Sequence, residues 1–283
     1  MSVVPFGARL AAAMDEHGPL CVGIDPHASL LEAWGLPDSP AGLRDFSARV
    51  VEAVGGRVAA VKPQAAFYER HGSAGLAVLE EVVAAARETG TLSIVDAKRG
   101  DIGSTMGAYA EAFLRDGSPL AGDALTVSPF LGFGSLAPAV ELAAATGRGL
   151  FVLCLTSNPE GASVQHARAR AGTTVAASIA AAASEVNAGA EPLGSVGLVV
   201  GATVGGAAQE TGTDLAAVNG PLLAPGVGAQ GAGPSELRAV FGDARRAVLA
   251  SSSRGVLRAG PDVASLRAAA LEAAGDAARA LRS

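Results

Sequence analysis

The alternation of short apolar runs with helical segments is the feature of this sequence that most constrains its fold. Valine, leucine and alanine fill the runs almost continuously, which is typical of parallel strands buried on both faces. Eight runs are predicted to be strands: 20–25, 58–63, 92–98, 124–128, 149–155, 196–202, 222–225 and 247–251. Helices are predicted at 6–16, 41–54, 75–88, 105–114, 135–145, 164–187, 235–241 and 263–281, with a weaker helical segment near Asp214.

Eight strand–helix units in 283 residues predict one (β/α)8 TIM barrel. An open, doubly wound sheet is the alternative architecture, because it also alternates parallel strands with helices. No low-complexity linker divides the chain, so residues 1–283 are expected to form a single α/β domain.

The composition allows a large core, since 49% of the residues are hydrophobic. The net charge of −6 argues against a general nucleic-acid surface, which would be basic. Cys21 and Cys154 lie in apolar runs and are predicted to be reduced core thiols. The sequence shows neither a signal-like amino terminus nor an uncharged apolar stretch of about 20 residues. We therefore expect a soluble, cytoplasmic protein.

Polar side chains gather at the carboxyl ends of the predicted strands. These residues are Asp25, Lys62, Asp96, Lys98, Ser128, Thr156, Ser157, Gln230 and Arg254. In a barrel, the carboxyl ends of the strands converge on one mouth, where such enzymes carry out their chemistry. Each residue alone could be a helix cap or a solvated strand end. Their common position predicts a functional site.

The run 94–103 places acidic and basic residues in a defined pattern. Asp96 and Lys98 are two positions apart, so they share one face of the strand. Asp101 falls in the loop beyond the strand, together with Gly100 and Gly103. This spacing suggests a lysine ammonium held between two carboxylates, which keep it protonated and repel an anionic group bound beside them. A solvated ladder of ion pairs at a strand end is the simpler interpretation.

The loops after the last two strands predict an anion site. Residues 224–233 are glycine-rich and can direct backbone amides at one point, where Gln230 adds a side-chain amide donor. Arg254 follows the eighth strand, and its guanidinium can hold a phosphate through two parallel hydrogen bonds. These loops form the usual phosphate site of this fold. Neither loop matches the P-loop pattern, which argues against a P-loop NTPase.

Six motifs in order resemble the orotidine 5'-phosphate decarboxylase family, in its longer bacterial (type 2) branch. The motifs are residues 20–27 (LCVGIDPH), 61–69 (VKPQAAFYE), 96–105 (DAKRGDIGST), 155–160 (LTSNPE), 224–230 (APGVGAQ) and 253–255 (SRG). The match extends from the first to the eighth predicted strand. In shorter relatives a glycine precedes the phosphate-binding arginine where Ser253 stands here.

This resemblance implies a homodimeric carboxy-lyase that converts orotidine 5'-monophosphate (OMP) to uridine 5'-monophosphate (UMP) and carbon dioxide, without cofactor or metal. The reaction is the last step of de novo pyrimidine synthesis. By similarity, Lys98 would stabilise a carbanion at C6 and protonate it, while Asp96 would stress the substrate carboxylate. Asp101 from the neighbouring subunit would complete a network with Lys62, Asp96 and Lys98.

The same resemblance implies the substrate-binding residues. Asp25 and Lys62 would hold ribose hydroxyls, and Gln230 and Arg254 would bind the phosphate. Three further residues are implied: Ile102 and Thr105, which would reach across the dimer, and Ser157, which would face the pyrimidine amide edge.

Three alternatives are weighed against this function. Related magnesium-dependent lyases and decarboxylases of sugar phosphates place an acidic metal ligand at the end of the second strand, where Lys62 stands here. A cation is a poor metal ligand, which disfavours this alternative. A non-catalytic barrel that binds nucleotide phosphates would leave the charged network without a role. A purely structural protein would leave all the mouth residues unexplained.

Overall fold

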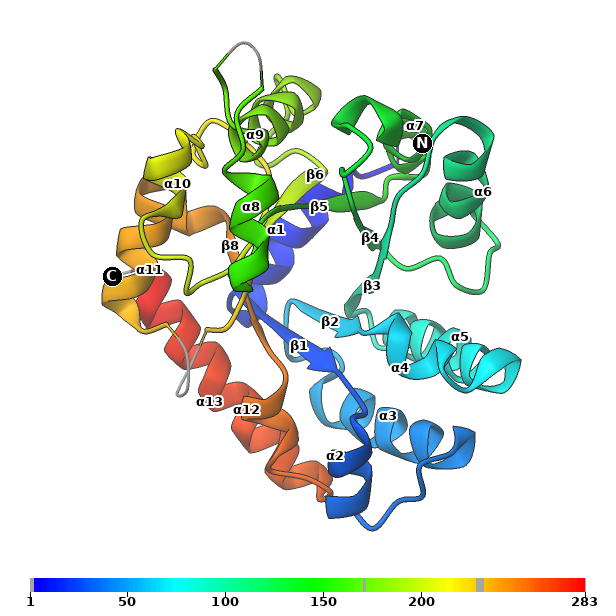
Figure 1. The fold of residues 1–283 in the computed structure, drawn as a ribbon. Coiled ribbons are helices and arrows are strands. Elements are labelled where there is room, and N and C mark those ends of the chain that lie inside the picture. Colours follow the sequence, from blue (N-terminus) through cyan, green and yellow to red (C-terminus); the bar gives the residue numbers. More distant parts are fainter. Residues whose placement is uncertain (1–2, 170–171, 228–231, 283) are drawn as a thin grey trace.

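Eight parallel strands close into a barrel in sequence order, and the helices form an outer ring around it (Figure 1). The computed structural model describes residues 3–169, 172–227 and 232–282. The strands are β1 (Leu20–Ile24), β2 (Ala60–Pro63), β3 (Leu92–Arg99), β4 (Ala124–Val127), β5 (Gly149–Leu155), β6 (Val196–Val200), β7 (Leu222–Pro225) and β8 (Val248–Ser252). Because β1 pairs with both β2 and β8, the ring is closed. The predicted barrel is confirmed, and the open sheet is excluded.

Most of the outer ring consists of the predicted helices. The α-helices are α1 (Phe6–His17), α2 (Ala28–Ala33), α3 (Pro40–Val54), α4 (Ala65–Glu69), α5 (Gly72–Glu88), α6 (Gly103–Leu114), α7 (Ala137–Thr146), α8 (Ala162–Gln165), α9 (Val175–Val186), α10 (Ala207–Thr211), α11 (Pro234–Phe241), α12 (Arg254–Leu257) and α13 (Val263–Arg282). Short 3-10 helices cover Phe133–Leu136, Pro159–Gly161 and Gly242–Ala247. In the described part of the chain, no helix is long and apolar enough to cross a membrane.

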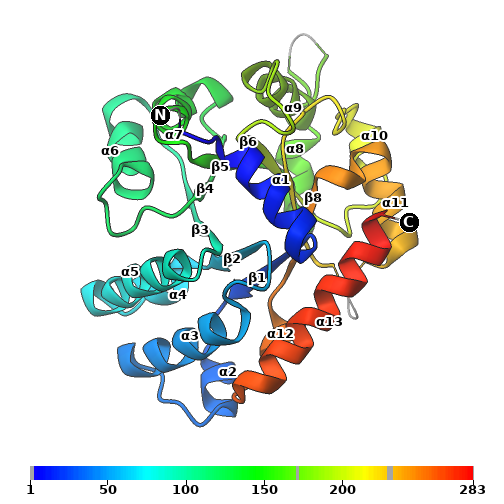
Figure 2. The same ribbon diagram turned by 180° about the vertical axis from the view of Figure 1, so that it is seen from behind.

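Helix α1 precedes the barrel and lies across one end of it, as Figure 2 shows. Phe6, Leu10 and Met14 on its buried face join the apolar cluster inside the barrel. The ring of Phe6 meets that of Phe151 from β5 edge to face, with the ring centroids 5.9 Å apart. A second and larger apolar cluster fills the space between the strands and the outer helices. Helix α1 therefore closes the amino-terminal end of the barrel, and the cavity lies at the other end.

Two helix predictions were wrong. The expected helix at 164–187 is interrupted: α8 ends at Gln165, and α9 begins only at Val175. Thr174 causes the new start, because its hydroxyl accepts a hydrogen bond from the amide of Ala177 and caps the helix. The segment near Asp214 is a turn in which the carboxylate accepts two backbone amides, and the helix lies earlier, at α10. Helices α2, α4 and α12 were not predicted.

Both cysteines are buried free thiols, as predicted. Burial in apolar surroundings raises the pKa of Cys21 and that of Cys154 to about 12. Both thiols therefore stay protonated and unreactive near neutral pH.

A buried asparagine ties three segments together on the outer side of the barrel. Asn187, which is 2% exposed, follows α9. Its side-chain amide donates to the carbonyls of Val196 (2.7 Å) and Val218 (2.9 Å) and accepts from the amide of Val196 (3.1 Å). One side chain thus links the end of α9 to the start of β6 and to the segment before β7.

Substituting Asn187→Leu should lower the free energy of unfolding by about 3 kcal/mol or more, because it leaves buried backbone groups without partners. Urea denaturation followed by circular dichroism measures this loss. The matched control is Asn158→Leu, which removes an exposed asparagine and should change stability by about 0.5 kcal/mol or less. Equal losses in the two variants would contradict the structural role of Asn187.

Candidate active site

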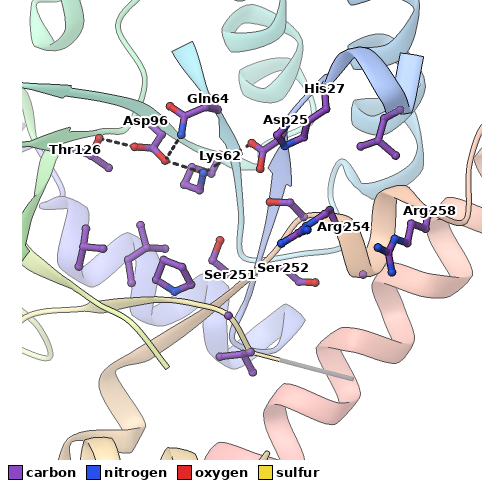
Figure 3. A pocket seen from close by; sticks show the side chains of 18 of the residues that line it. Asp25, His27, Lys62, Gln64, Asp96, Thr126, Ser251, Ser252, Arg254 and Arg258 are labelled. Carbon is purple, nitrogen blue, oxygen red and sulfur yellow. Dashed lines mark hydrogen bonds and ion pairs between the residues drawn. The ribbon is translucent and has the colours of Figure 1, made fainter. Parts of the chain in front are cut away.

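A cavity of about 1000 Å³ opens at the carboxyl ends of the strands. Figure 3 shows its polar lining, with Asp96 and its neighbours on one side and Arg254 and Arg258 on the other. The polar residues that line it include Asp25, His27, Lys62, Gln64, Asp96, Lys98, Thr126, Ser251, Ser252 and Arg254. The cavity therefore brings together residues from opposite sides of the ring.

The side chain of Asp96 is the centre of the most highly connected group. Its Oδ1 accepts hydrogen bonds from Lys98 Nζ (2.6 Å) and Thr126 Oγ1 (2.8 Å). Its Oδ2 accepts from Lys62 Nζ (2.8 Å) and Gln64 Nε2 (3.1 Å). We call these five residues the Asp96 cluster. Two donors at each oxygen hold the carboxylate in one orientation.

The charge of Asp96 is fixed by its two lysine neighbours. Burial alone would raise the pKa of a carboxyl that is 6% exposed. The ammonium groups of Lys62 and Lys98 outweigh that effect and lower the pKa of Asp96 from its ordinary value of 3.8 to about 2. Asp96 is therefore a permanent anion near neutral pH.

Lys62 is held as a buried cation at the end of β2. Burial disfavours its charged form, but the carboxylates of Asp96 and Asp25 outweigh that effect and raise its pKa above the ordinary range. Its Nζ lies 3.9 Å from Asp25 Oδ1. That oxygen is buried and has no hydrogen-bond partner within the described part of the chain. Asp25 also lines the cavity, next to this lysine.

Lys98 differs from Lys62 in its exposure. Its side chain is 44% exposed, compared with 7% for Lys62, so its ammonium can reach a molecule in the cavity. Its backbone has φ 48°, in the left-handed region, where the pairing of β3 with β4 shifts register between Val95 and Arg99. Such irregularities in strands re-aim side chains next to functional sites.

The arrangement within one chain is the reverse of the sequence-based expectation for this run. A carboxylate, Asp96, lies between two lysines, whereas the spacing suggested Lys98 between two carboxylates. Asp101 turns back on its own backbone, and its Oδ1 accepts from the amide of Ile102 at 2.8 Å. As expected from strand geometry, Asp96 and Lys98 share one face and are in contact.

The structure places the other predicted residues in three groups. Asp25 and Arg254 line the cavity, and Arg254 is exposed at the start of α12. The described residues that line the cavity do not include Asp101, Ile102, Thr105, Thr156 or Ser157. Ile102, Thr105 and Ser157 are exposed. Gln230 lies outside the described residues.

Sequence reasoning missed two members of the Asp96 cluster. Gln64 lies two positions after Lys62, and the two-residue repeat of a strand could have identified it as facing the same way. On β4, Thr126 reaches the cavity, whereas Ser128, which was predicted, does not line it within the described part of the chain. Thr126 sits in a fully buried run, so only its contact across the strands reveals its role.

Fold and site together define a (β/α)8-barrel enzyme that acts on a small anionic molecule, because fixed charges and a rim arginine surround one cavity at the mouth. The chain belongs to the orotidine 5'-phosphate decarboxylase / HUMPS family, whose sequence model matches residues 18–269.

Relatives at high identity cover nearly the whole chain. The orotidine 5'-phosphate decarboxylase of Salinispora arenicola is 63% identical over 265 residues, 94% of each chain. That of Streptomyces coelicolor is 63% identical over 266 residues, again 94% of each chain. A crystal structure from Streptomyces avermitilis, described under the same enzyme name, has a TM-score of 0.96 at 62% identity and covers 100% of this chain and 98% of its own.

The depressed pKa of Asp96 predicts how the stability of the protein depends on pH. Because the unfolded chain binds this proton more readily, the charged carboxylate contributes about 2 kcal/mol to folding above about pH 4, and this is lost as the pH falls towards about 2. The stability difference between wild type and Asp96→Asn should therefore narrow by about 1 kcal/mol between about pH 6 and about pH 3.

Urea titrations at several pH values measure this difference. The control variant, Asp15→Asn, removes a carboxylate that is 83% exposed. Its difference in stability from wild type should stay constant as the pH falls, whereas that of Asp96→Asn should become smaller. A difference for Asp96→Asn that stays constant down to about pH 3 would contradict the electrostatic account.

Proposed function

We propose that this chain converts OMP to UMP and carbon dioxide, the last step of UMP synthesis. The observation that carries the proposal is the Asp96 cluster, in which a permanent anion and a reachable ammonium group are in contact at the mouth of the barrel. Relatives that carry this enzyme name match 94% of the chain at 63% identity.

The chemistry explains why such a cluster is needed. When the bond between C6 and the carboxyl group breaks, the electron pair stays at C6 in the plane of the ring, where the pyrimidine π system cannot delocalise it. Stabilisation must then come from charges that are already in position. The Lys98 ammonium is the accessible cation of the cluster, so it stabilises the carbanion and then transfers a proton from Nζ to C6.

Asp96 supplies the opposing charge. A substrate carboxylate next to it is repelled, and the repulsion disappears when carbon dioxide leaves. At about 4 Å two unit charges interact by roughly 4 kcal/mol at an effective dielectric of about 20, which is large enough to lower a barrier. The four hydrogen bonds to Asp96 prevent it from turning away from the substrate.

The remaining cavity residues bind the rest of the nucleotide. Asp25 and the ammonium of Lys62 hold ribose hydroxyls, and Arg254 holds the phosphate. Gln230, which lies outside the described residues, is also assigned to the phosphate. Phosphate binding also stabilises a closed site, which lowers the barrier at a distance from C6. The enzyme needs no metal in this proposal, because Asp96 is already occupied by two cations and two neutral donors. Ser157, after β5, is assigned to the pyrimidine amide edge.

We also propose a cytoplasmic homodimer whose active sites are shared. The free thiols Cys21 and Cys154 are consistent with a reducing compartment. Ile102, Phe130 and Leu131, in the loops after β3 and β4, are 54–76% exposed. Large apolar side chains of this kind are typical of protein interfaces. Across such an interface the partner would add Asp101, Ile102 and Thr105 to each site.

The activity is tested by the absorbance of OMP incubated with the protein in EDTA. Wild type should consume the orotate chromophore, and Lys98→Ala should lower kcat by about 1000-fold or more, because it removes both the stabilising charge and the proton donor. Arg115→Ala, on an exposed ion pair, is the control and should behave as wild type. No turnover by wild type would refute the proposed function.

The shared site is tested by mixing two inactive variants, Lys98→Ala and Asp101→Ala. Random exchange of subunits in a symmetric dimer gives hybrids in which one of the two sites has both wild-type residues, so about a quarter of the wild-type activity should return. Light scattering before and after exchange confirms the dimer. If subunits exchange without any gain in activity, Asp101 does not act across the interface.

A further inference from the structure

The backbone of Lys98 adopts a conformation that its residue type rarely takes. In the described part of the chain, only Lys98 and Asn219 have positive φ among residues other than glycine. Asparagine enters this region readily, whereas a long, unbranched residue such as lysine does so only where the surroundings hold it there. Something near Lys98 must therefore compensate for this conformation.

The hydroxyl of Thr126 provides that compensation. Its Oγ1 accepts a hydrogen bond from the backbone amide of Lys98 at 2.9 Å and donates its own proton to Asp96 Oδ1 at 2.8 Å. Thr126 is 1% exposed on β4, and its bond to Asp96 is buried, whereas its bond to the Lys98 amide is partly buried. One oxygen atom thus ties the Lys98 backbone to the carboxylate that its ammonium contacts.

We propose that Thr126 is a positioning residue, which fixes the backbone of Lys98 in the left-handed conformation. It thereby holds the Lys98 ammonium against Asp96, in the position from which a proton is transferred to the substrate. This inference rests on the proposed decarboxylation. It assigns to Thr126 a role that needs both functions of a hydroxyl, because the oxygen must accept from Lys98 and donate to Asp96 at the same time.

A valine at this position would occupy similar space but could neither accept nor donate. The Lys98 amide would lose its partner in a partly buried location, and the backbone would relax towards a more common φ. The ammonium would move with it, away from the place at which it meets the substrate. A serine would keep both hydrogen bonds and lose only a methyl group.

The first test is steady-state kinetics with OMP. Thr126→Val should lower kcat by about 10- to 100-fold, the range expected for a misplacement of about 1 Å, while KM changes by about threefold or less. Thr126→Ser should restore kcat to within about threefold of wild type. Thr126→Ala replaces the valine variant if the latter does not fold. The control, Thr213→Val, removes a buried hydroxyl that bonds Thr211, and should leave kcat unchanged.

The second test does not depend on turnover. Lys62 and Lys98 are the only lysines in the sequence, and only Lys98 has a substantially exposed side chain. Trinitrobenzenesulfonate labelling, located by peptide mass spectrometry, therefore reports on Lys98. Labelling should be about three- to tenfold faster in Thr126→Val than in wild type or Thr126→Ser, because a less firmly held ammonium is more available to the reagent.

The outcomes separate the inference from the function on which it rests. If wild type does not consume OMP, the proposed function is refuted. Independently of turnover, a labelling rate of Lys98 that is the same in Thr126→Val as in wild type overturns the positioning role. If wild type is active and Thr126→Val matches it in kcat, the positioning role is overturned. A loss of kcat that Thr126→Ser does not restore shows a role in packing and overturns it as well.

Discussion

The pairing of Asp96 with two lysines is the interaction on which the rest of the site depends. A carboxylate that is 6% exposed cannot remain ionised without compensating charge, and a buried ammonium such as that of Lys62 needs a carboxylate for the same reason. Each group makes the charge of the other possible. The cluster is therefore a single unit, in which two cations and one anion keep fixed positions before any ligand arrives.

The barrel makes this unit possible because neighbouring strands deliver its members at one level. Lys62 comes from β2, Asp96 and Lys98 from β3, and Thr126 from β4. A bridge between Gln64 and Asp96 continues the pairing of β2 with β3 beyond the regular ladder. The irregular pairing of β3 with β4 then turns the Lys98 backbone towards Thr126. The pairing of neighbouring strands thus determines the relative positions of the cluster residues, and the residue types determine their charges and hydrogen bonds.

The parts of the structure that depend on local patterns could be predicted from the sequence, and the parts that depend on contacts between distant segments could not. All eight strands were predicted, because continuous apolar runs identify strands that are buried on both faces. The alanine-rich region 164–187 keeps helical spacing throughout, so periodicity alone did not reveal that Thr174 starts a new helix. The mouth residues Asp25, Lys62, Asp96, Lys98 and Arg254 were predicted from their place at or just past the carboxyl ends of strands. Thr126 was missed, since its contact with Asp96 crosses from one strand to the next, whereas Gln64 could have been found from its spacing to Lys62.

Helix α1 has a consequence for how ligands and water enter and leave the cavity. Phe6, Leu10 and Met14 seal the floor of the barrel, and packed apolar side chains fill the interior above them. In the part of the chain that the structure describes, the cavity is closed towards the amino-terminal end of the barrel and opens at the carboxyl ends of the strands. Water displaced by an incoming ligand must leave through the opening that admits the ligand, and so must every product. Substrate binding and product release therefore use the same opening, and any group that narrows this opening slows both.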